Sequence, residues 1–407
     1  MRPLRDTIPF DEALARTLGA ASPIERIERV PLSRANGRVL AEDIIAQGDV
    51  PAFDRAAMDG FAVRAADTAD ASPGAPKTLR CVDAIYTGQA PARAIAAGEC
   101  AEIATGAPMP PGADAVVMVE ETDRADGSPA RPLVRIMKAV QDRQNVGPRG
   151  TDLRQGETVL RTGELLTPSR VGACAAAGRA AIEVYAQPIV AIVSTGSEVV
   201  APGEPLGAAQ VHDVNGSTLA GVVSMYGGVA RLLSSVGDDL PALRSTLAEG
   251  VRSADIMVLS GGSSVGEKDL VLDVVREAGD VLFHGIAVKP GKPTALARVG
   301  TTIVLAMPGN PASCLSNAYL LLVPMLRKMA RLPAHIPRAV TVPLAARIAS
   351  TTGRHQFYTV RLVDGAAVPA FKSSGDITSM SGADGYLEVP ADTDVVEAGQ
   401  TVDVKLF

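Results

Sequence analysis

The residues with the clearest chemical potential form a loop rich in glycine and serine at positions 260–269, SGGSSVGEKD. The run Ile256–Leu259 before it is short and apolar, as in a buried strand, and apolar residues recur at helical spacing from Leu270 to Gly279. A loop between a strand and a helix start turns backbone N–H groups and the positive end of the helix dipole towards an anion. The pattern predicts an anion site, although an ordinary turn between a strand and a helix has the same composition.

Two further polar loops follow predicted strands. Ser194–Glu198 follows the apolar run Ile189–Val193, and Pro308–Pro311 follows the run Thr302–Ala306. Predicted strands alternate with predicted helices over this region, which is typical of βαβ units and a largely parallel sheet. Ligands bind such sheets at the carboxyl ends of the strands, so we expect the three loops to converge on one site.

The remainder of the chain has a different texture. Residues 7–18 have a helical pattern, and residues 30–46 alternate around Asn36-Gly37, which predicts a hairpin. Residues 73–140 are rich in Gly, Pro and short apolar runs, which indicates a small β-rich domain. Residues 333–407 alternate without helical period. The predicted fold class is therefore a multidomain α/β protein with a β-rich insert and a C-terminal β-barrel-like domain.

Composition narrows the function classes. Of the 407 residues, 47% are hydrophobic and 21% are charged, which suits a globular protein with an ample core. The net charge of −6 disfavours a nucleic-acid binder, and we expect no membrane association because no apolar run is long enough to span a bilayer. The four cysteines, at 81, 100, 174 and 314, are scattered. Zinc is therefore not expected, and a reducing cytoplasm fits best.

Seven short motifs, spread over nearly the whole chain, give a specific resemblance. The chain resembles the molybdopterin molybdenumtransferases, the family that inserts molybdenum into molybdopterin and includes the E domain of gephyrin. The motifs are residues 57–62 (AMDGFA), 105–108 (TGAP), 148–152 (PRGTD), 194–198 (STGSE), 260–269, 288–293 (VKPGKP) and 307–311 (MPGNP).

The resemblance implies an architecture and a reaction. Its four domains would be residues 1–48 with 149–187, the β-rich insert 49–148, the α/β molybdopterin-binding domain 188–332, and the C-terminal β domain 333–407. It implies a homodimer in which the insert of one subunit approaches the α/β domain of the other. The reaction implied is insertion of molybdenum from molybdate into adenylylated molybdopterin, with Mg²⁺ as cofactor and AMP released. Partner proteins would be the preceding molybdopterin adenylyltransferase and acceptor molybdoenzymes.

Binding of molybdate, a small dianion, requires donors and local positive charge. Lys289 and Lys292 flank Pro290-Gly291 and can present two ammonium groups on a stiff turn; the less favoured alternative is two solvated surface lysines. By resemblance Ser313, Arg354 and Ser379 join them. The resemblance also assigns binding of the organic ligand to the three loops, at Thr195, Gly196, Ser260, Gly261, Gly262, Ser263, Ser264, Gly266, Pro308, Gly309, Asn310 and Pro311.

Carboxylates have a separate role in the implied reaction. Glu198, Asp238 and Asp269 can hold magnesium on the phosphates or position water, with Asp238 and Asp269 as the metal ligands. Asp238 could instead cap a helix, and Asp269 could be an ordinary acid in the first turn of one. The resemblance adds Asp59 and Thr105 to the catalytic residues, although both types are also frequent in turns.

One position departs from the pattern of the family. Many relatives carry a lysine where this chain has Gly285, so either His284 supplies the missing charge or that lysine is dispensable here. Arg149 and Asp152 could form an ion pair between domains, and we assign them no catalytic role.

Three other functions compete with the transferase. A non-catalytic scaffold or molybdopterin-binding protein of the same fold is disfavoured by the retained Asp59, Thr105, Glu198, Asp269 and Lys289. The adenylyltransferase is disfavoured by the additional domains on both sides of 188–330. A general nucleotide or sugar-phosphate enzyme is disfavoured because neither GxxxxGK[ST] nor GxGxxG after a strand is present.

Overall fold

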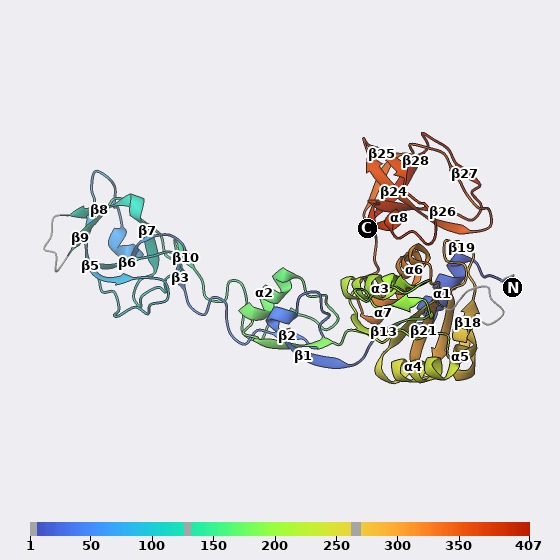
Figure 1. Ribbon diagram of the computed structural model, residues 1–407. Coiled ribbons are helices and arrows are strands. Elements are labelled where there is room, and N and C mark those ends of the chain that lie inside the picture. The colour runs from blue at the N-terminus through green and yellow to red at the C-terminus, as the bar shows by residue number, and fades with distance from the viewer. Residues whose placement is uncertain (1–5, 126–131, 262–269) are drawn as a thin grey trace. The chain divides into compact units, whose positions relative to one another are not determined.

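The computed structural model describes residues 6–125, 132–261 and 270–407 (Figure 1). These residues form two compact units. The larger unit comprises the described residues of Met1–Glu28, Gly37–Val39 and Val184–Phe407, and the smaller unit comprises those of Arg29–Asn36 and Leu40–Glu183. This division is coarser than the four predicted domains, whose boundaries stay a prediction. Strands β1 (Ile27–Pro31) and β12 (Ala181–Tyr185) include points where the chain passes between the units.

A six-stranded sheet of described residues forms the centre of the larger unit, in the order β16-β13-β17-β21-β20-β18. The first four strands are parallel, whereas β20 is antiparallel to both of its neighbours. The predicted strands after 188 are confirmed, and the antiparallel edge is an addition that the sequence pattern did not predict. The strands are β13 (Ile189–Ser194), β16 (Val229–Leu232), β17 (Ile256–Ser260), β18 (Asp280–His284), β20 (Ala295–Val299) and β21 (Thr302–Met307).

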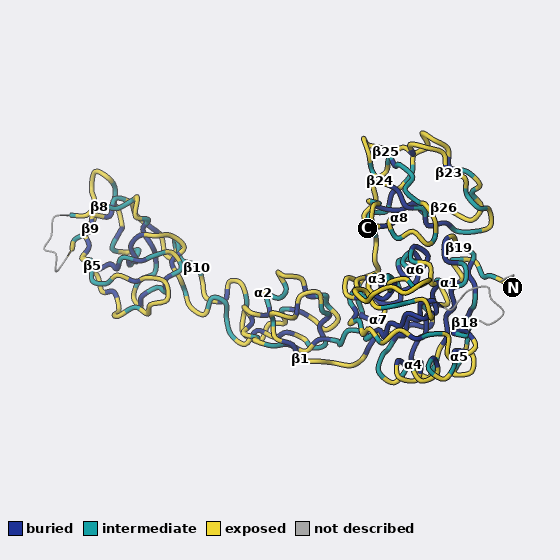
Figure 2. Tube along the Cα trace, viewed as in Figure 1, coloured by how far each residue is buried: buried dark blue, intermediate teal, exposed yellow. Residues whose placement is uncertain are grey.

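Helices cover both faces of this sheet, because successive strand residues point to opposite sides. Val190 and Ile192 belong to the apolar core that includes α1, α3, α6 and α7, whereas Ala191 and Val193 belong to the core with α4 and α5. Buried residues are concentrated in these layers (Figure 2). The helices are α1 (Phe10–Ala20), α3 (Val214–Met225), α4 (Leu240–Ser253), α5 (Leu270–Ala278), α6 (Pro311–Asn317), the π-helix η4 (Ala318–Leu322) and α7 (Val323–Met329).

The C-terminal β domain, within the larger unit, confirms the predicted β-rich character of residues 333–407. Its sheet has the order β19-β24-β26-β28-β22, and β25 pairs with β24. Stacked Phe357 and Tyr386 rings, with centroids 4.0 Å apart, lie in its apolar contact with the α/β layers. The elements are β19 (Val288–Lys289), β22 (Ala339–Pro343), β23 (Ile348–Ala349), β24 (His355–Val363), β25 (Ala366–Pro369), α8 (Thr378–Ser381), β26 (Gly385–Val389), β27 (Val395–Val396) and β28 (Thr401–Leu406).

The smaller unit contains a β-rich domain, as predicted, with the strand order β7-β4-β6-β5-β9-β8. The elements of this domain are β4 (Gly60–Val63), η2 (Ala65–Thr68), β5 (Lys77–Ile85), β6 (Glu99–Ile103), β7 (Ala115–Met118), η3 (Val119–Glu121), β8 (Thr122–Ala125) and β9 (Leu133–Ile136). The rest of the unit comprises η1 (Leu32–Arg34), β2 (Ile44–Ile45), β3 (Arg55–Ala56), β10 (Val146–Gly147), β11 (Thr158–Leu160) and α2 (Pro168–Ala176).

The predicted hairpin over residues 30–46 is wrong. A short 3₁₀-helix, η1, follows β1, and β2 pairs with the distant strand β11. Asn36-Gly37 does form a turn, with Gly37 at φ +77°. The strands on the two sides of the turn pair with distant strands, β1 with β12 and β2 with β11, so a good turn dipeptide did not produce a hairpin.

None of the four cysteines forms a disulfide within the described residues. Cys100, Cys174 and Cys314 are buried and Cys81 is half-buried, and all four are free thiols. Within the described ranges, no helix combines the length and apolar character needed to cross a bilayer.

Candidate functional site

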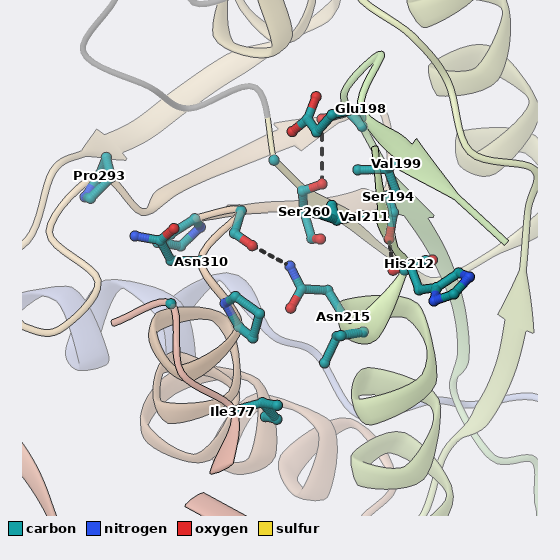
Figure 3. Close-up of a pocket in the computed structure, with 18 residues that line it drawn as sticks. Ser194, Glu198, Val199, Val211, His212, Asn215, Ser260, Pro293, Asn310 and Ile377 are labelled. Carbon is teal, nitrogen blue, oxygen red and sulfur yellow. Dashed lines mark hydrogen bonds between the residues drawn. The ribbon is translucent and has the colours of Figure 1, made fainter. Parts of the chain in front are cut away.

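The carboxyl ends of three parallel strands bring the predicted loops together. Ser194, Ser260 and Met307 are direct neighbours at the ends of β13, β17 and β21. A pocket of about 820 Å³ opens beyond them (Figure 3), which confirms the expected convergence. Its lining includes Ser194, Thr195, Glu198, Asp213, Asn215, Ser260, Gly261, Pro293, Pro308, Gly309, Asn310, Pro311, Gly375 and Ile377, with part of the short pair β14 (Val199–Val200) and β15 (Val211–His212).

Backbone hydrogen bonds fix the three loops against one another. Thr195 N donates to Ser260 O at 2.7 Å, and Gly261 N donates to Met307 O at 3.1 Å. Gly261 has φ +108°, and a Cβ there would lie only 2.1 Å from Thr195 O. The crossing therefore admits only glycine at this position. Gly261, which was predicted to bind the ligand, is thus also required by the local backbone structure.

Glu198 lies over its own loop at the pocket rim. Its Oε2 lies 2.5 Å from the position that a Gly196 Cβ would occupy, and Gly196 has φ +135°. The carboxylate is exposed and lines the pocket (Figure 3). Glu198 can therefore meet a ligand, a metal-bound water or a proton on the pocket side.

Asp213 and Asn215, at the start of α3, are pocket residues that the sequence interpretation missed. Ser194 Oγ donates to Asp213 Oδ1 at 2.7 Å, and Gly216 N donates to the same oxygen at 2.8 Å, so Asp213 caps the helix. Asn215 Nδ2 donates to Gly309 O at 2.8 Å (Figure 3). An acid just before a helix start is a recognisable capping pattern. Because α3 lies between β13 and β16 of the six-stranded sheet, its first residues could have been recognised as candidates for the site.

Two buried polar atoms of the pocket residues are left without a partner. Ser260 Oγ and Asn215 Oδ1 accept or donate no hydrogen bond with the nitrogen and oxygen atoms of the described residues. The Cys314 thiol lies beside Ser260, and burial raises the pKa of this thiol to about 12, so it stays a neutral, weak partner. An unsatisfied buried polar group costs about 1–3 kcal/mol. Such a cost is expected where a ligand supplies the missing hydrogen bonds.

A segment of the C-terminal β domain closes one side of the pocket. Asn310 Nδ2 donates to Ser374 Oγ at 2.9 Å, and Ala312 N donates to Ser374 O at 3.0 Å. Gly375 and Ile377 line the pocket next to these contacts. The sequence pattern of residues 374–377 gave no indication of this, because the contact is between distant parts of the chain.

The two predicted lysines lie on the connection between β18 and β20, and Pro293 of the same connection lines the pocket. Lys289 is exposed, and its Nζ donates to Thr351 Oγ1 at 2.8 Å. Lys289 pairs with Gln356 in the parallel β19–β24 register, which places Arg354 just before the neighbouring strand. Arg354 is thus two positions from the strand partner of Lys289, and Lys289, Lys292 and Arg354 are not among the residues that line the pocket.

The predicted serines differ from the lysines in exposure. Ser313, in α6, and Ser379, in α8, are both buried. Ser379 Oγ donates to Asp376 O at 2.7 Å, so its hydrogen already has an acceptor. Neither residue is among those lining the pocket, and a direct role for them in anion binding stays a prediction.

The backbone explains the departure at Gly285. Gly285 has φ +91°, a conformation that a lysine adopts only with strain, and its N–H donates to Thr294 O at 2.9 Å. Burial and the nearby Arg276 guanidinium lower the pKa of His284 below its ordinary value. The lowered pKa favours the neutral imidazole, so the alternative that His284 supplies the missing charge is disfavoured.

The two readily confused acids before α4 have separate roles. Asp239 caps the helix by accepting from Ala242 N at 2.8 Å. Asp238 instead lies beside the first pocket loop: Ser197 Oγ is 3.3 Å from Asp238 Oδ2, and Asp238 N is 3.2 Å from Ser197 Oγ. The capping alternative for Asp238 is therefore wrong, and its carboxylate is exposed.

Asp59 and Thr105 form their own site in the smaller unit. Thr105 donates both its N–H, at 2.7 Å, and its Oγ1–H, at 2.9 Å, to Asp59 Oδ1. These bonds, the backbone one first, hold the pKa of Asp59 below its ordinary value. Asp59 lines a second pocket of about 590 Å³ together with Tyr86, Glu102 and Arg124. The pair therefore presents an ionised carboxylate to solvent.

Arg149 does not form its pair with Asp152. Its Nε donates to Asp49 Oδ2 at 2.5 Å, and its backbone N–H donates to Asp54 Oδ1 at 2.7 Å. The interaction links two segments of the smaller unit and is structural.

Part of the predicted site lies outside the described residues: Gly262, Ser263, Ser264, Gly266 and Asp269. Within the parts of the chain that are described, no three His, Cys, Asp or Glu side chains lie together as a candidate metal site. The predicted two-carboxylate magnesium site is thus neither completed nor replaced by another cluster there.

Comparisons with known proteins agree over the whole chain. Three family models match: "MoeA N-terminal region (domain I and II)" at residues 8–178, "Probable molybdopterin binding domain" at 191–328, and "MoeA C-terminal region (domain IV)" at 341–407. Molybdopterin molybdenumtransferase 2 of Mycobacterium tuberculosis is 33% identical, covering 98% of this chain and 99% of its own. Molybdopterin molybdenumtransferase of Bacillus subtilis is 30% identical, covering 99% and 95%.

Solved structures give the same result for the fold. The crystal structure of a molybdopterin biosynthesis MoeA protein from Pyrococcus horikoshii is 35% identical, with a TM-score of 0.83 over 98% of this chain and 99% of that one. A second structure from that organism has a TM-score of 0.79 at 31% identity. The likeness confirms the predicted fold class.

Proposed function

Because the chain belongs to the molybdopterin molybdenumtransferase family, we propose that it inserts molybdenum from molybdate into adenylylated molybdopterin and releases AMP. The family membership itself makes the protein a transferase of molybdenum cofactor biosynthesis. The proposal specifies which two substrates meet and which residues of this chain act on them.

One observation carries the proposal for the organic substrate: Ser260 Oγ and Asn215 Oδ1, at the 820 Å³ pocket, have no nitrogen or oxygen partner among the described residues. A molybdopterin adenylate presents amino and amide hydrogens on its rings and oxygens on its phosphates. Asn215 Oδ1 can accept from a ring N–H, and Ser260 Oγ can donate or accept. Binding would therefore remove the cost of two buried, unpaired atoms, which an apolar ligand of the same size would leave in place.

The second substrate, molybdate, is a dianion, so its binding depends mainly on positively charged side chains. Lys289 and Lys292 provide positive charge on the connection whose Pro293 lines the pocket, and Arg354 directly precedes β24, the strand that pairs with Lys289. Charge-assisted hydrogen bonds to oxyanions are about twice as strong as neutral ones. We assign molybdate to the Lys289–Lys292 turn, so that the metal oxyanion would bind close to the organic ligand.

Magnesium fits the donor chemistry of this chain. Mg²⁺ is usually held by one or two carboxylates with water and substrate phosphates completing the octahedron, so a cluster of three acids is not required. Asp238, which is exposed and held beside Ser197, and Asp269 would be the ligands, with Glu198 positioned to orient water. When bound, the ion would neutralise charge on the phosphates.

Three further assignments complete the proposal. The protein acts as a homodimer in the cytoplasm, and Asp59 and Thr105 contribute an ionised carboxylate to the reaction. It receives substrate from the molybdopterin adenylyltransferase and passes product to acceptor molybdoenzymes. The exposure of the Asp59 carboxylate, which both Thr105 bonds keep ionised, supports its catalytic part.

The proposal is tested by supplying purified protein with adenylylated molybdopterin, magnesium and micromolar molybdate, and following AMP and active cofactor. Molybdate-dependent AMP release that is lost in Lys289→Ala and Asp269→Asn, and retained in the exposed-lysine control Lys77→Ala, supports the transferase. Intact ligand binding with no turnover in the parent protein overturns it and leaves the non-catalytic scaffold as the function.

A further inference from the structure

A fully buried amide connects the last turn of α6 to the loop that carries the two lysines. Asn317 is 0% exposed. Its Nδ2 donates to Gly291 O at 2.9 Å and to Thr294 Oγ1 at 2.6 Å. Thr294 Oγ1, itself fully buried, donates to Gly291 O at 2.9 Å. Asn317, Gly291 and Thr294 thus form a closed triangle of hydrogen bonds, which we call the amide triangle.

The amide triangle includes the backbone between the two lysines. Gly291 precedes Lys292 by one residue and follows Lys289 by two. Gly291 has φ +107°, and a Cβ at this position would lie 2.2 Å from Asn317 Nδ2. The backbone between the lysines is therefore pressed against the amide, and its path leaves room for no side chain other than that of glycine.

The same short helix carries the pocket loop at its other end. α6 runs from Pro311 to Asn317, so it begins with the last residue of the Pro308–Pro311 loop and ends with the amide that holds Gly291. Seven residues of helix span roughly 10 Å. Asn317 therefore sets the position of the lysine turn relative to the loop that lines the organic-ligand pocket.

We propose that Asn317, through the amide triangle, is a positioning residue that holds the Lys289–Lys292 turn where it binds the tetrahedral oxyanion. This inference rests on the proposed function, in which that turn takes molybdate. The physical reason is that two flexible lysines bind a small anion well only when the backbone between them is fixed, because a misplacement of about 1 Å can cost about 10²-fold in rate.

Removal of the amide loosens the turn without touching either substrate. In Asn317→Ala, Gly291 O retains only Thr294 as a side-chain donor, and the site gains a small cavity. We expect the KM for molybdate to rise about tenfold or more, and the affinity for tungstate, a tetrahedral dianion of the same shape, to fall equally. We expect the KM for adenylylated molybdopterin to change less than about twofold, because the pocket residues keep their contacts.

A second pair of variants keeps the inference testable if Asn317→Ala does not fold. Thr294→Val removes the hydroxyl from the amide triangle at nearly constant volume, and Thr294→Ser retains it. The first should shift the molybdate KM and tungstate affinity in the same direction, and the second should restore them. Ser316→Ala is the control, since Ser316 Oγ donates within α6, to Ser313 O at 3.1 Å.

Comparison with Lys289→Ala separates this inference from the proposed function. If Lys289→Ala leaves tungstate affinity unchanged, the oxyanion is not bound at this turn and the proposed function loses its anion site. If Lys289→Ala weakens tungstate binding but Asn317→Ala and Thr294→Val do not, or if they alter both substrates equally, the positioning role alone is overturned. Weakening of tungstate alone by all three supports both.

Discussion

Asn215 Nδ2 donates to Gly309 O at 2.8 Å, which ties the start of α3 to the loop after β21, while Oδ1 of the same amide is buried and has no partner within the described part of the chain. One side chain thus shapes the pocket with its nitrogen and leaves its oxygen for a ligand. We expect Asn215→Ala to lower the free energy of unfolding by about 1 kcal/mol and to weaken binding of adenylylated molybdopterin at least tenfold. Denaturant titration and equilibrium binding measure the two effects, and unchanged affinity would contradict the role of Oδ1.

Ser260→Ala should separate stability from binding. The hydroxyl has no nitrogen or oxygen partner among the described residues, so its removal relieves a buried unsatisfied group. We expect the free protein to be as stable as the parent or up to about 1 kcal/mol more stable, with ligand affinity reduced. Thermal unfolding with and without ligand tests this, and Ser316→Ala, whose hydroxyl is bonded inside α6, is the matched control.

The pKa of Asp59 should depend on Thr105. Thr105→Val removes the Oγ1 bond and keeps the backbone bond, so we expect the pKa of Asp59 to rise part of the way to its ordinary value. Because the folded pKa is lowered, the group's contribution to stability is present above the unfolded pKa and is lost as the pH falls below about 4. Carbon NMR titration of the carboxyl measures the shift, and Thr105→Ser, which retains the hydroxyl, should show none.

Gly285→Lys tests whether the residue of many relatives can be restored. With φ +91° at this position, any side chain is strained, so we expect both Gly285→Lys and Gly285→Ala to cost about 1 kcal/mol of stability. Neither should increase the turnover rate. Faster turnover in the lysine variant alone would show that the missing charge limits this chain.

The proposed homodimer has a complementation test. If the insert of one subunit completes the site of the other, mixed dimers of Asp59→Asn and Lys289→Ala subunits contain one intact site. After subunit exchange in an equal mixture, about a quarter of the parent activity should return, since half of the dimers are mixed and half of their sites are intact. No recovery, with exchange demonstrated by a mass-labelled subunit, would mean that both residues act within one subunit or that no dimer forms.

Local patterns predicted the elements that depend on local sequence. The strands ending at Ser194, Ser260 and Met307 were predicted because each is a short apolar run followed by a polar loop, and parallel pairing then placed the loops together. The cap of α2 is equally local: Thr167, directly before Pro168, accepts from Arg170 N through its hydroxyl, and threonine is a common residue at this position.

Contacts between distant segments of the chain could not be predicted from the sequence. The pairing of β18 with β20, Arg149 with Asp49, and Ser374 with Asn310 depends on how the chain folds back, which no local period encodes. The assignment of the cap to Asp239 instead of Asp238 depends on a single residue of helix phase, and element ends are the least determined part of any pattern.

The Ser374 contacts with Asn310 and Ala312 limit how the chain can be recombined. The C-terminal β domain forms a compact portion of the sequence, which invites its exchange between homologues as a separate module. Yet Gly375 and Ile377 line the pocket together with the loops after β13, β17 and β21. A chimaera joined near residue 333 would therefore combine residues 374–377 of one homologue with the strand-end loops of another. We therefore expect residues 374–377 and the strand-end loops to have changed together during the divergence of the family.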